Sequence, residues 1–218
     1  MTRIAIVGGH GKVALHLSTL LASNGHTVTS FIRNPDHAAD VEATGATAAV
    51  LDIENATTAD IAQALTGQEA VVWSAGAGGG SPERTYAVDR DAAIRSMDAA
   101  AQVGTKRYVM VSYLGARTDH GVPAENSFFA YAEAKAAADE YLRGTDLDWT
   151  ILAPGNLTLD DATGQIDVDP AADGERATSR ANTAIVAAAV LAQPGTIGRF
   201  IGFRDGATPV EAALAQLG

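Results

Sequence analysis

The chain has no cysteine, which excludes disulfides, thiolate metal sites and cysteine nucleophiles. Basic residues are also few: 15 Lys and Arg stand against 26 Asp and Glu, and the net charge is −11. A protein whose main partner is nucleic acid or an anionic membrane needs a basic face. We therefore expect neither of these partners, and expect a small-molecule substrate instead.

Long apolar segments are missing too. The longest apolar run, residues 184–192, is less than half of a membrane span. Met1-Thr2-Arg3 lead into only four apolar residues, too few for the core of a signal peptide. A cytoplasmic protein is therefore expected. The histidines show no spacing typical of metal ligands, so no metal is expected; they are His10, His16, His26, His37 and His120.

Short apolar runs typical of buried strands alternate with helical patterns along the chain. The expected strands cover residues 3–7, 27–32, 46–51, 70–73, 107–111, 149–152 and 197–203. Helices are expected to end at Asn24-Gly25, near Gly67, at Gly104 and at Gly144, and a further helix is expected at about 180–193. The alternation predicts a doubly wound α/β fold, with a mostly parallel sheet of six to seven strands and helices on both faces.

No linker, low-complexity tract or internal repeat divides the chain, so residues 1–218 are expected to form a single domain. The regular alternation weakens beyond Pro154, where residues 156–178 are rich in Asp, Gly and Thr. Together with residues 113–127, this stretch is expected to form a small cap on the substrate side. Only 65 residues run from Pro154 to the last residue, so we expect a small or open substrate pocket.

The stretch VGGHGKVA, residues 7–14, follows the first expected strand and opens the first expected helix. A pyrophosphate docks at a helix N-terminus, because free backbone N–H groups and the helix dipole point at it. Docking needs a tight turn, no side chain at the phosphate, and a small residue where helix meets sheet; Gly8, Gly11 and Ala14 supply these in order. We interpret the loop as a dinucleotide site, and a glycine-rich turn without ligand is the alternative.

The end of the second expected strand indicates which dinucleotide is bound. A carboxylate there would accept hydrogen bonds from an adenosine ribose and repel a 2′-phosphate. The sequence has FIRNP instead, with Arg33 where the 2′-phosphate would lie. A guanidinium favours the phosphorylated cofactor through charge-assisted hydrogen bonds. We therefore predict NADP, as NADPH, with NAD still possible and a surface arginine at a strand end as the alternative.

Eight stretches follow one another along the chain in an order and spacing typical of one protein group. They are IAIVGGHGKVA, FIRNP, LDIE, VVWSAGAGGG, GTKRYVMVSYLGA, YAEAK, LDWTILAPGNLT and GRFIGFRDGATPVEAAL. In these, nearly the whole chain resembles the single-domain, atypical short-chain dehydrogenase/reductases. That group includes NmrA-like and biliverdin-reductase-B-like proteins and those called NAD-dependent epimerase/dehydratase-like. The resemblance implies a Rossmann fold, with NADP lying across the carboxyl ends of the strands.

The resemblance also implies where the cofactor would lie. Asp52 and Ile53 would flank the adenine, and the backbone around Ser74 to Gly76 would pass the ribose and phosphates. Asp52 has a plain alternative as a polar residue that ends a strand. The full set of expected cofactor-binding residues is Gly8, His10, Gly11, Lys12, Val13, Arg33, Asp52, Ile53, Ser74, Ala75, Gly76, Ser112, Lys135, Pro154, Gly155 and Asn156.

Ser112, Tyr131 and Lys135 are the candidate catalytic residues. Tyr131 and Lys135 are four residues apart in an expected helix, so they share a face. In active members of the resembled group, such a trio protonates a carbonyl while NADPH delivers hydride. A phenol needs a nearby cation to shuttle protons near neutrality, and we expect Lys135 to supply it. An amphipathic helix with Tyr131 packed and Lys135 solvated is the alternative.

Two departures from the resembled group stand out. Tyr113 follows the strand-five serine where many relatives have a small hydroxyl residue, and Ala153 stands where they commonly have arginine. Extended sugar-nucleotide epimerases build a large lobe after the sixth strand, for which this chain has little room. We predict an NADP-dependent reductase of a small carbonyl, quinone or flavin-type acceptor. The alternatives are a non-catalytic NADP(H) sensor acting on a protein partner, and a small epimerase or dehydratase.

Overall fold

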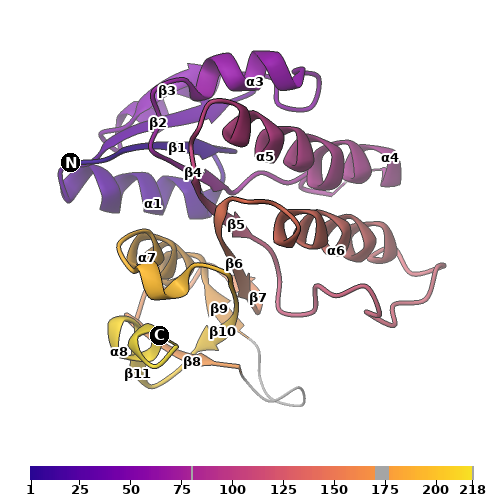
Figure 1. Cartoon of the computed structure of the whole chain (residues 1–218). Coiled ribbons are helices and arrows are strands. Elements are labelled where there is room, and N and C mark those ends of the chain that lie inside the picture. The colour runs from indigo at the N-terminus through magenta and orange to yellow at the C-terminus, as the bar shows by residue number, and fades with distance from the viewer. Residues whose placement is uncertain (80, 170–176, 218) are drawn as a thin grey trace.

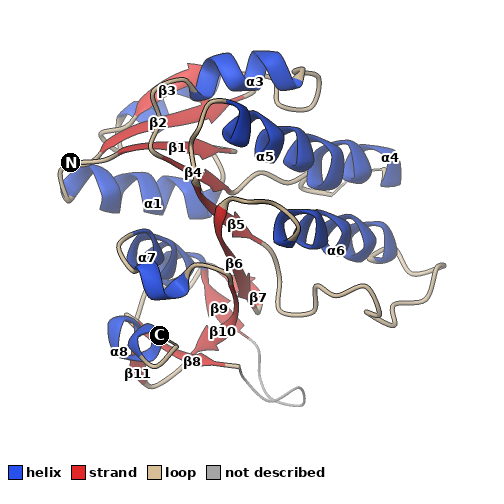
Figure 2. Ribbon diagram, in the orientation of Figure 1, coloured by secondary structure: helices blue, strands red, loops and turns tan. Residues whose placement is uncertain are grey.

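The computed structural model describes residues 1–79, 81–169 and 177–217. A nine-stranded sheet runs through the molecule in the order β11-β8-β10-β6-β5-β4-β1-β2-β3 (Figures 1 and 2). Its parallel strands are β1 (Arg3–Val7), β2 (Thr27–Ile32), β3 (Thr47–Val50), β4 (Ala70–Trp73), β5 (Arg107–Val111), β6 (Asp148–Pro154) and β10 (Arg199–Asp205). The order reverses between β1 and β4, which is the doubly wound arrangement predicted from the sequence.

The expected count of six to seven strands was too low. Two short antiparallel strands, β8 (Gln165–Val168) and β11 (Thr208–Pro209), extend the sheet beyond β10. The strand β11 was missed because it has only two residues, and β8 was missed because it lies within a stretch rich in Asp and Gly. Two more, β7 (Asn156–Thr158) and β9 (Ala177–Ser179), pair in a separate small sheet.

Helices cover both faces of the sheet, as Figure 2 shows. One face carries α1 (Lys12–Ser23), α7 (Arg180–Leu191) and α8 (Val210–Ala215), and the other carries α3 (Thr58–Leu65), α5 (Ala93–Gln102) and α6 (Phe129–Arg143). Alternate residues of a strand point to opposite faces. Accordingly Ile4 and Ile6 pack into the core beneath α1 and α7, and Ala5 and Val7 into the core beneath α3, α5 and α6.

Local sequence signals explain where the main helices begin and end. The backbone and side chain of Thr57 and Asp60 bond to each other at the start of α3, as the predicted capping box requires. The helix α1 ends at Asn24, and Gly25 follows with a φ of +78°, where a side chain would be strained. The same pattern recurs after α5, where Gly104 has a φ of +78°.

Several short elements had no clear sequence signal. They are a 3₁₀ turn η1 (Pro35–His37), α2 (Ala38–Glu42), α4 (Pro82–Thr85), a π-helical segment η2 (Tyr86–Ala92) that continues into α5, and a 3₁₀ turn η3 (Pro194–Thr196). Segments of π-helix are rare and frequently lie at functional sites. Here η2 contains Asp89, whose side chain reaches the carboxyl edge of the sheet. Of the expected cap, residues 170–176 lie outside the described part of the chain.

Candidate functional site

The glycine loop after β1 presses against neighbouring backbone. Gly8 has a φ of +85°, and a Cβ there would lie 2.6 Å from both Cα and N of Ala75. A Cβ on Gly9 would lie 2.5 Å from the Cβ of Ser30, so this glycine, which the spacing argument omitted, is required as well. Gly11 is the N-cap of α1, and because it has no side chain, it leaves the N-terminus of the helix uncovered. The loop therefore forms a cradle of bare backbone at a helix N-terminus.

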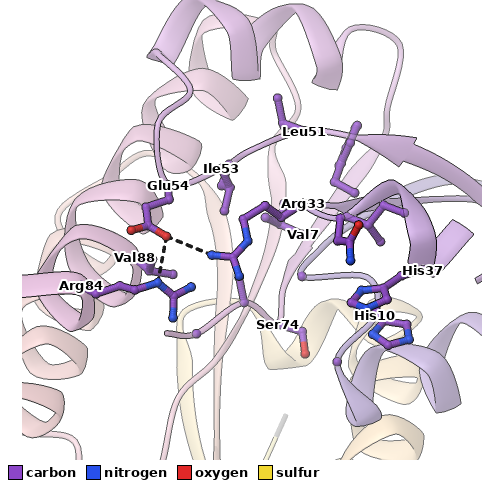
Figure 3. A pocket seen from close by; sticks show the side chains of 17 residues that line it. Val7, His10, Arg33, His37, Leu51, Ile53, Glu54, Ser74, Arg84 and Val88 are labelled. Carbon is purple, nitrogen blue, oxygen red and sulfur yellow. Dashed lines mark hydrogen bonds and ion pairs between the residues drawn. The ribbon is translucent and has the colours of Figure 1, made fainter. Parts of the chain in front are cut away.

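A cavity of about 330 Å³ opens beside this cradle, at the carboxyl ends of β1, β2, β3 and β4 (Figure 3). Its walls include residues from all four strand ends. The predicted cofactor-binding residues that line it are Gly8, His10, Gly11, Arg33, Ile53, Ser74, Ala75 and Gly76.

Two predicted cofactor-binding residues, His10 and Asp52, have side chains that interact with specific neighbours. The ring of His10 stacks on that of His37 with 3.7 Å between centroids, and its Nε2 lies 2.9 Å from Oδ2 of Asp40. Asp52 does not line the cavity, because its Oδ2 turns to accept a hydrogen bond from Asn55. Its Oδ1 is buried without a hydrogen-bond partner among the described residues.

Three charged side chains meet at the open side of this cavity. Nη1 of Arg33 lies 3.2 Å from Oε2 of Glu54, and Nε of Arg84 lies 3.0 Å from the same oxygen. Figure 3 shows both guanidinium groups pointing at that carboxylate. The sequence argument found no acid at the end of β2, yet the loop after β3 brings Glu54 to that place. We call Arg33, Glu54 and Arg84 the outer charge group.

Glu54 and Arg84 were not predicted as site residues. Arg84 is held by a short hydrogen bond of 2.5 Å from Nη1 to the carbonyl of Ala77. No spacing rule relates residues 33, 54 and 84, because they follow or precede elements that only the folded sheet brings together. Within LDIE, Asp52 and Ile53 were predicted to flank the adenine, but the last residue, Glu54, is the one that lies beside Arg33.

A second cavity, of about 610 Å³, continues from the first along the same sheet edge. The two cavities share Gly11 and the Ser74–Gly76 backbone. Of the predicted residues, Lys12, Val13, Ser112, Tyr131 and Lys135 also line it. The three candidate catalytic residues are therefore brought together in one cavity that adjoins the glycine cradle.

Lys135 is buried, with 1% of its surface exposed, so the alternative with a solvated lysine is wrong. Its Nζ donates a hydrogen bond of 2.8 Å to the carbonyl of Val111. Two buried carboxyl groups face it, those of Asp89 and Asp139. Burial raises the pKa of both carboxyl groups, and the charge of Lys135 opposes that rise. We call Asp89, Lys135 and Asp139 the inner charge group; sequence reasoning missed both acids.

Each inner carboxylate also holds a neighbouring group. Oδ2 of Asp89 accepts a hydrogen bond of 2.9 Å from the backbone N of Ala77, in the glycine-rich loop after β4. Oδ2 of Asp139 accepts a hydrogen bond of 2.5 Å from the hydroxyl of Ser112, which follows β5. The inner charge group thus fixes one wall of the second cavity and the hydroxyl of a candidate catalytic residue.

The surroundings of Tyr131 differ from the expectation. Burial raises the pKa of Tyr131, and the nearby Asp89, Tyr113 and Asp139 raise it further. The Tyr131 hydroxyl makes no hydrogen bond to any residue that the structure describes. Lys135 donates its hydrogen bond to the carbonyl of Val111 instead of to Tyr131. The expected lowering of the phenol pKa by Lys135 is therefore wrong for the protein in this structure.

Aromatic rings separate the second cavity from a third. The ring of Tyr113 lies 5.4 Å from that of Phe128 and 5.4 Å from that of Tyr131, between centroids. The third cavity, of about 540 Å³, is lined by Ser112 and these rings. It also contains the remaining predicted cofactor contacts, Pro154, Gly155 and Asn156.

Arg180 borders both the second and the third cavity and was not predicted. Its Nη1 donates hydrogen bonds of 2.9 Å to the carbonyls of Leu157 and Thr158. The resembled group commonly has an arginine where this chain has Ala153. Here Arg180, at the start of α7, brings a guanidinium to the third cavity, which the neighbouring Pro154 and Gly155 also line. The sequence predicted a helix at about 180–193, which begins at Arg180, but it gave no sign that this side chain reaches a cavity.

The residues along this edge fit a dinucleotide. A Cβ on Gly8 would collide with the backbone of Ala75, and Gly11 leaves the N-terminus of α1 without a side chain, which is what close approach of a pyrophosphate requires. The first and second cavities adjoin on either side of that cradle. This matches the general position of ligands in doubly wound sheets, outside the carboxyl ends of the strands where the order reverses.

Among the described residues, no three His, Asp or Glu side chains gather as metal ligands would. Within residues 1–79, 81–169 and 177–217, none of the helices has the length and apolar character needed to cross a bilayer.

Comparison with known proteins agrees with the geometry. Residues 8–194 match the NAD(P)H-binding family. The chain is 33% identical over 218 residues to a Bacillus subtilis protein called uncharacterized sugar epimerase YhfK, covering 99% of this chain and 100% of that one. A solved structure of a candidate NAD-dependent epimerase/dehydratase from Bacillus halodurans is 31% identical, with a TM-score of 0.91 over 99% of this chain and 100% of that chain. The oxidoreductase ylbE from Lactococcus lactis is 27% identical, with a TM-score of 0.87 over 99% and 96%.

Proposed function

The chain belongs to the NAD(P)H-binding family, within the atypical short-chain dehydrogenase/reductases, and from this premise we propose that it is an NADP-dependent oxidoreductase. It reduces a small carbonyl, quinone or flavin-type acceptor by hydride transfer. One observation carries the proposal: Ser112, Tyr131 and buried Lys135 line the cavity that adjoins the glycine cradle. Candidate proton donors thus lie beside the position expected for a nicotinamide.

The chain's own residues would divide the binding of the cofactor between them. The N-terminus of α1, bare at Gly11, would hold the pyrophosphate, and Ile53 would lie against the adenine. Lys135 would hold the nicotinamide ribose from the opposite end. When bound, the cofactor supplies the hydride, and everything else is positioning and proton supply by the protein.

The outer charge group supports a preference for NADP. Arg33 lies where the 2′-phosphate of the adenosine ribose is expected, and Arg84 adds a second cation within reach of Glu54. A phosphate dianion bonds to guanidinium groups more strongly than a hydroxyl does. Glu54 acts against this preference, because a carboxylate repels the phosphate and can accept hydrogen bonds from ribose hydroxyls. We propose that the two arginines outweigh it.

The size of the third cavity limits the acceptor. Its volume of about 540 Å³ is in the range of small-molecule sites. The rings of Tyr113, Phe128 and Tyr131 give it an apolar wall suited to a flat acceptor. The sugar-epimerase name belongs to the Bacillus subtilis relative, and the short strands β7, β8 and β9 do not amount to a large sugar-nucleotide lobe in the described part of the chain.

A screen of acceptors tests the proposal. Aldehydes, quinones and flavins are each mixed with the protein and NADPH, and the loss of NADPH absorbance is followed. We expect at least one class to be reduced catalytically, with the rate proportional to protein. Binding of NADPH without any turnover would favour the sensor acting on a protein partner. Conversion of a sugar with the cofactor retained and not consumed would favour an epimerase or dehydratase.

A further inference from the structure

Asp139 is the most deeply buried acid near the site, with none of its surface exposed. Its Oδ2 lies 2.5 Å from the hydroxyl oxygen of Ser112, and its Oδ1 has no hydrogen-bond partner among the described residues. A buried carboxylate oxygen without a partner is costly when the group is ionised. The same oxygen costs much less when the carboxyl group carries a proton.

The charges around Asp139 point the same way. Lys135 on the same helix and Arg143 one turn further on lower the pKa of Asp139, and burial raises it more strongly. Asp89, on η2, faces the same ammonium group. Arg84 also acts on Asp89. Arg84 and Arg143 each pair with a glutamate, Glu54 and Glu140, so their charges are offset outside the buried cluster. The buried cluster itself has one ammonium and two carboxyl groups, a net charge of −1, and a single proton shared by the two acids removes it.

Ser112 connects this buried proton to the reaction site. Its backbone follows β5 at the carboxyl edge of the sheet, and it lines both the second and the third cavity. When Asp139 is ionised, the Ser112 hydroxyl donates to it and can only accept from a substrate. When Asp139 is protonated, the carboxyl O–H donates to Ser112, and the serine hydroxyl becomes free to donate into the cavity.

We propose that Ser112 and Asp139 form the path that delivers a proton to the acceptor's oxygen. Ser112 is the catalytic residue, because it would touch that oxygen, and Asp139 is a positioning and proton-supplying residue behind it. The proposal rests on the proposed reductase function. It assigns to Tyr131 a hydrogen bond to the acceptor and to its ring a packing role, in place of proton donation.

The step is balanced for a carbonyl acceptor. The carbonyl carbon receives a hydride with its electron pair from NADPH, the C=O π bond breaks, and that pair stays on the oxygen. This oxygen takes the proton of the Ser112 hydroxyl, and Ser112 takes the proton of the Asp139 carboxyl group. The products are the alcohol, NADP⁺ and an Asp139 carboxylate, which regains a proton from water after the product leaves.

The first test reads the protonation of Asp139 directly and needs no substrate. The carboxyl carbons of aspartate are labelled with ¹³C, and their NMR signals are titrated from about pH 4 to about pH 9 in the free protein. The Asp139→Asn variant assigns the Asp139 signal. We expect this signal to titrate above the ordinary range of aspartate. An Asp139 signal that titrates within or below that range overturns the proposal, whether or not the protein is a reductase.

The second test measures turnover of NADPH with 9,10-phenanthrenequinone as the probe. Ser112→Ala and Asp139→Asn should each lower kcat by about 10²–10⁴-fold. Asp139 lines none of the three cavities, so Asp139→Asn should keep its NADPH affinity within about twofold of the wild type. Asp139→Glu should restore part of the rate. The wild-type kcat should fall as pH rises through the Asp139 titration, and this fall should be absent from Asp139→Asn. Glu140→Gln, at the exposed neighbouring position on α6, is the matched control and should leave kcat unchanged.

The outcomes separate the two proposals. A wild-type protein that neither binds NADPH nor reduces the quinone contradicts the proposed function, while the NMR titration still decides the state of Asp139. A wild-type protein that reduces the quinone, together with an Asp139→Asn variant of equal kcat and equal pH profile, contradicts the proton path alone. Circular dichroism of each variant confirms that it is folded before its rate is compared.

Discussion

The outer and inner charge groups are built from opposite charges at the two ends of one groove. The outer group has two cations around one carboxylate, and 57% of the Arg33 side chain is exposed. The inner group has two carboxyl groups around one cation, and Lys135 is only 1% exposed. Exposed charges stay ionised and are screened by water and salt, whereas buried charges must be paired or neutralised. The outer group is therefore suited to selecting a ligand by charge, and the inner group to holding a proton.

Gly11 borders both the first and the second cavity, so a large side chain there should disable both ends at once. A Cβ would lie 3.2 Å from the carbonyl O of Gly8, and the rest of a leucine would extend over the N-terminus of α1. We expect Gly11→Leu to abolish NADPH binding in a nicotinamide fluorescence titration while the protein stays folded.

Gly144→Leu is the matched control, because Gly144, like Gly11, is a helix-capping glycine with a negative φ, here at the C-terminus of α6, and lies on no wall of the three cavities. This control should bind NADPH like the wild type. Unchanged NADPH affinity in Gly11→Leu would contradict the assignment of the loop.

Lys135→Met breaks the inner group by leaving two buried carboxyl groups without their cation. Removing one partner of a buried ion pair typically costs about 3–5 kcal/mol of unfolding free energy. The cost depends on pH, because burial already raises the pKa of Asp89 and Asp139 above the unfolded value and loss of the cation raises it further. A raised folded-state pKa contributes stability that is lost as pH rises through it.

Urea unfolding therefore should find Lys135→Met much less stable than the wild type at about pH 8 and closer to it at about pH 5. A variant that unfolds near neutrality would still be measurable at the lower pH. Equal losses at both pH values would show that the carboxyl groups do not depend on Lys135, and would remove the contrast between the two charge groups.

Arg33→Ala breaks the outer group. NADPH should lose about 1.5–3 kcal/mol of binding free energy, the value of a hydrogen bond to a charged group, and NADH should lose much less. Isothermal titration calorimetry of both cofactors measures the difference. Since the Arg33 side chain is 57% exposed, raising the salt concentration should shrink the NADPH advantage of the wild type. An equal loss for both cofactors would mean that Arg33 does not touch the 2′-phosphate.

Glu54→Gln sharpens the comparison with the smallest expected effect. This substitution removes the negative charge that both arginines contact and keeps the shape of the side chain. NADPH should bind more tightly by about 0.2–1 kcal/mol, as expected for a partly exposed charge pair, and NADH should gain nothing. Weaker binding of NADPH in this variant would indicate that Glu54 orients the arginines more than it competes with the phosphate.

The sequence predicted the fold well because its signals are local. Most parallel strands contain a continuous apolar run, and α1 and α3 had recognisable ends in Gly25 and in the Thr57–Asp60 capping box. The strand β11 was not predicted because two residues are too few to show a period, and β8 was not predicted because its four residues include Gln165 and Asp167, unlike the four apolar residues of β4. Their pairing is decided by the edge of β10, which is a property of the folded sheet.

The site was predictable where backbone chemistry determines it and not where side chains from distant elements meet. The glycine loop was identified from spacing, and Ser112, Tyr131 and Lys135 from their residue types. Asp139 escaped because an aspartate in an alanine-rich helix has no feature that reveals burial. Glu54 escaped because its neighbour Arg33 is 21 residues away in sequence.

Calorimetric titration of the wild-type protein with NADPH and with NADH, in one buffer of low ionic strength, tests the central claim most directly. The claim is that a dinucleotide lies along the groove with its 2′-phosphate at the exposed, doubly cationic end. It predicts one site per chain and tighter binding of NADPH than of NADH, by an amount that Arg33→Ala removes. Equal affinities for the two cofactors, or no binding of either, would contradict it.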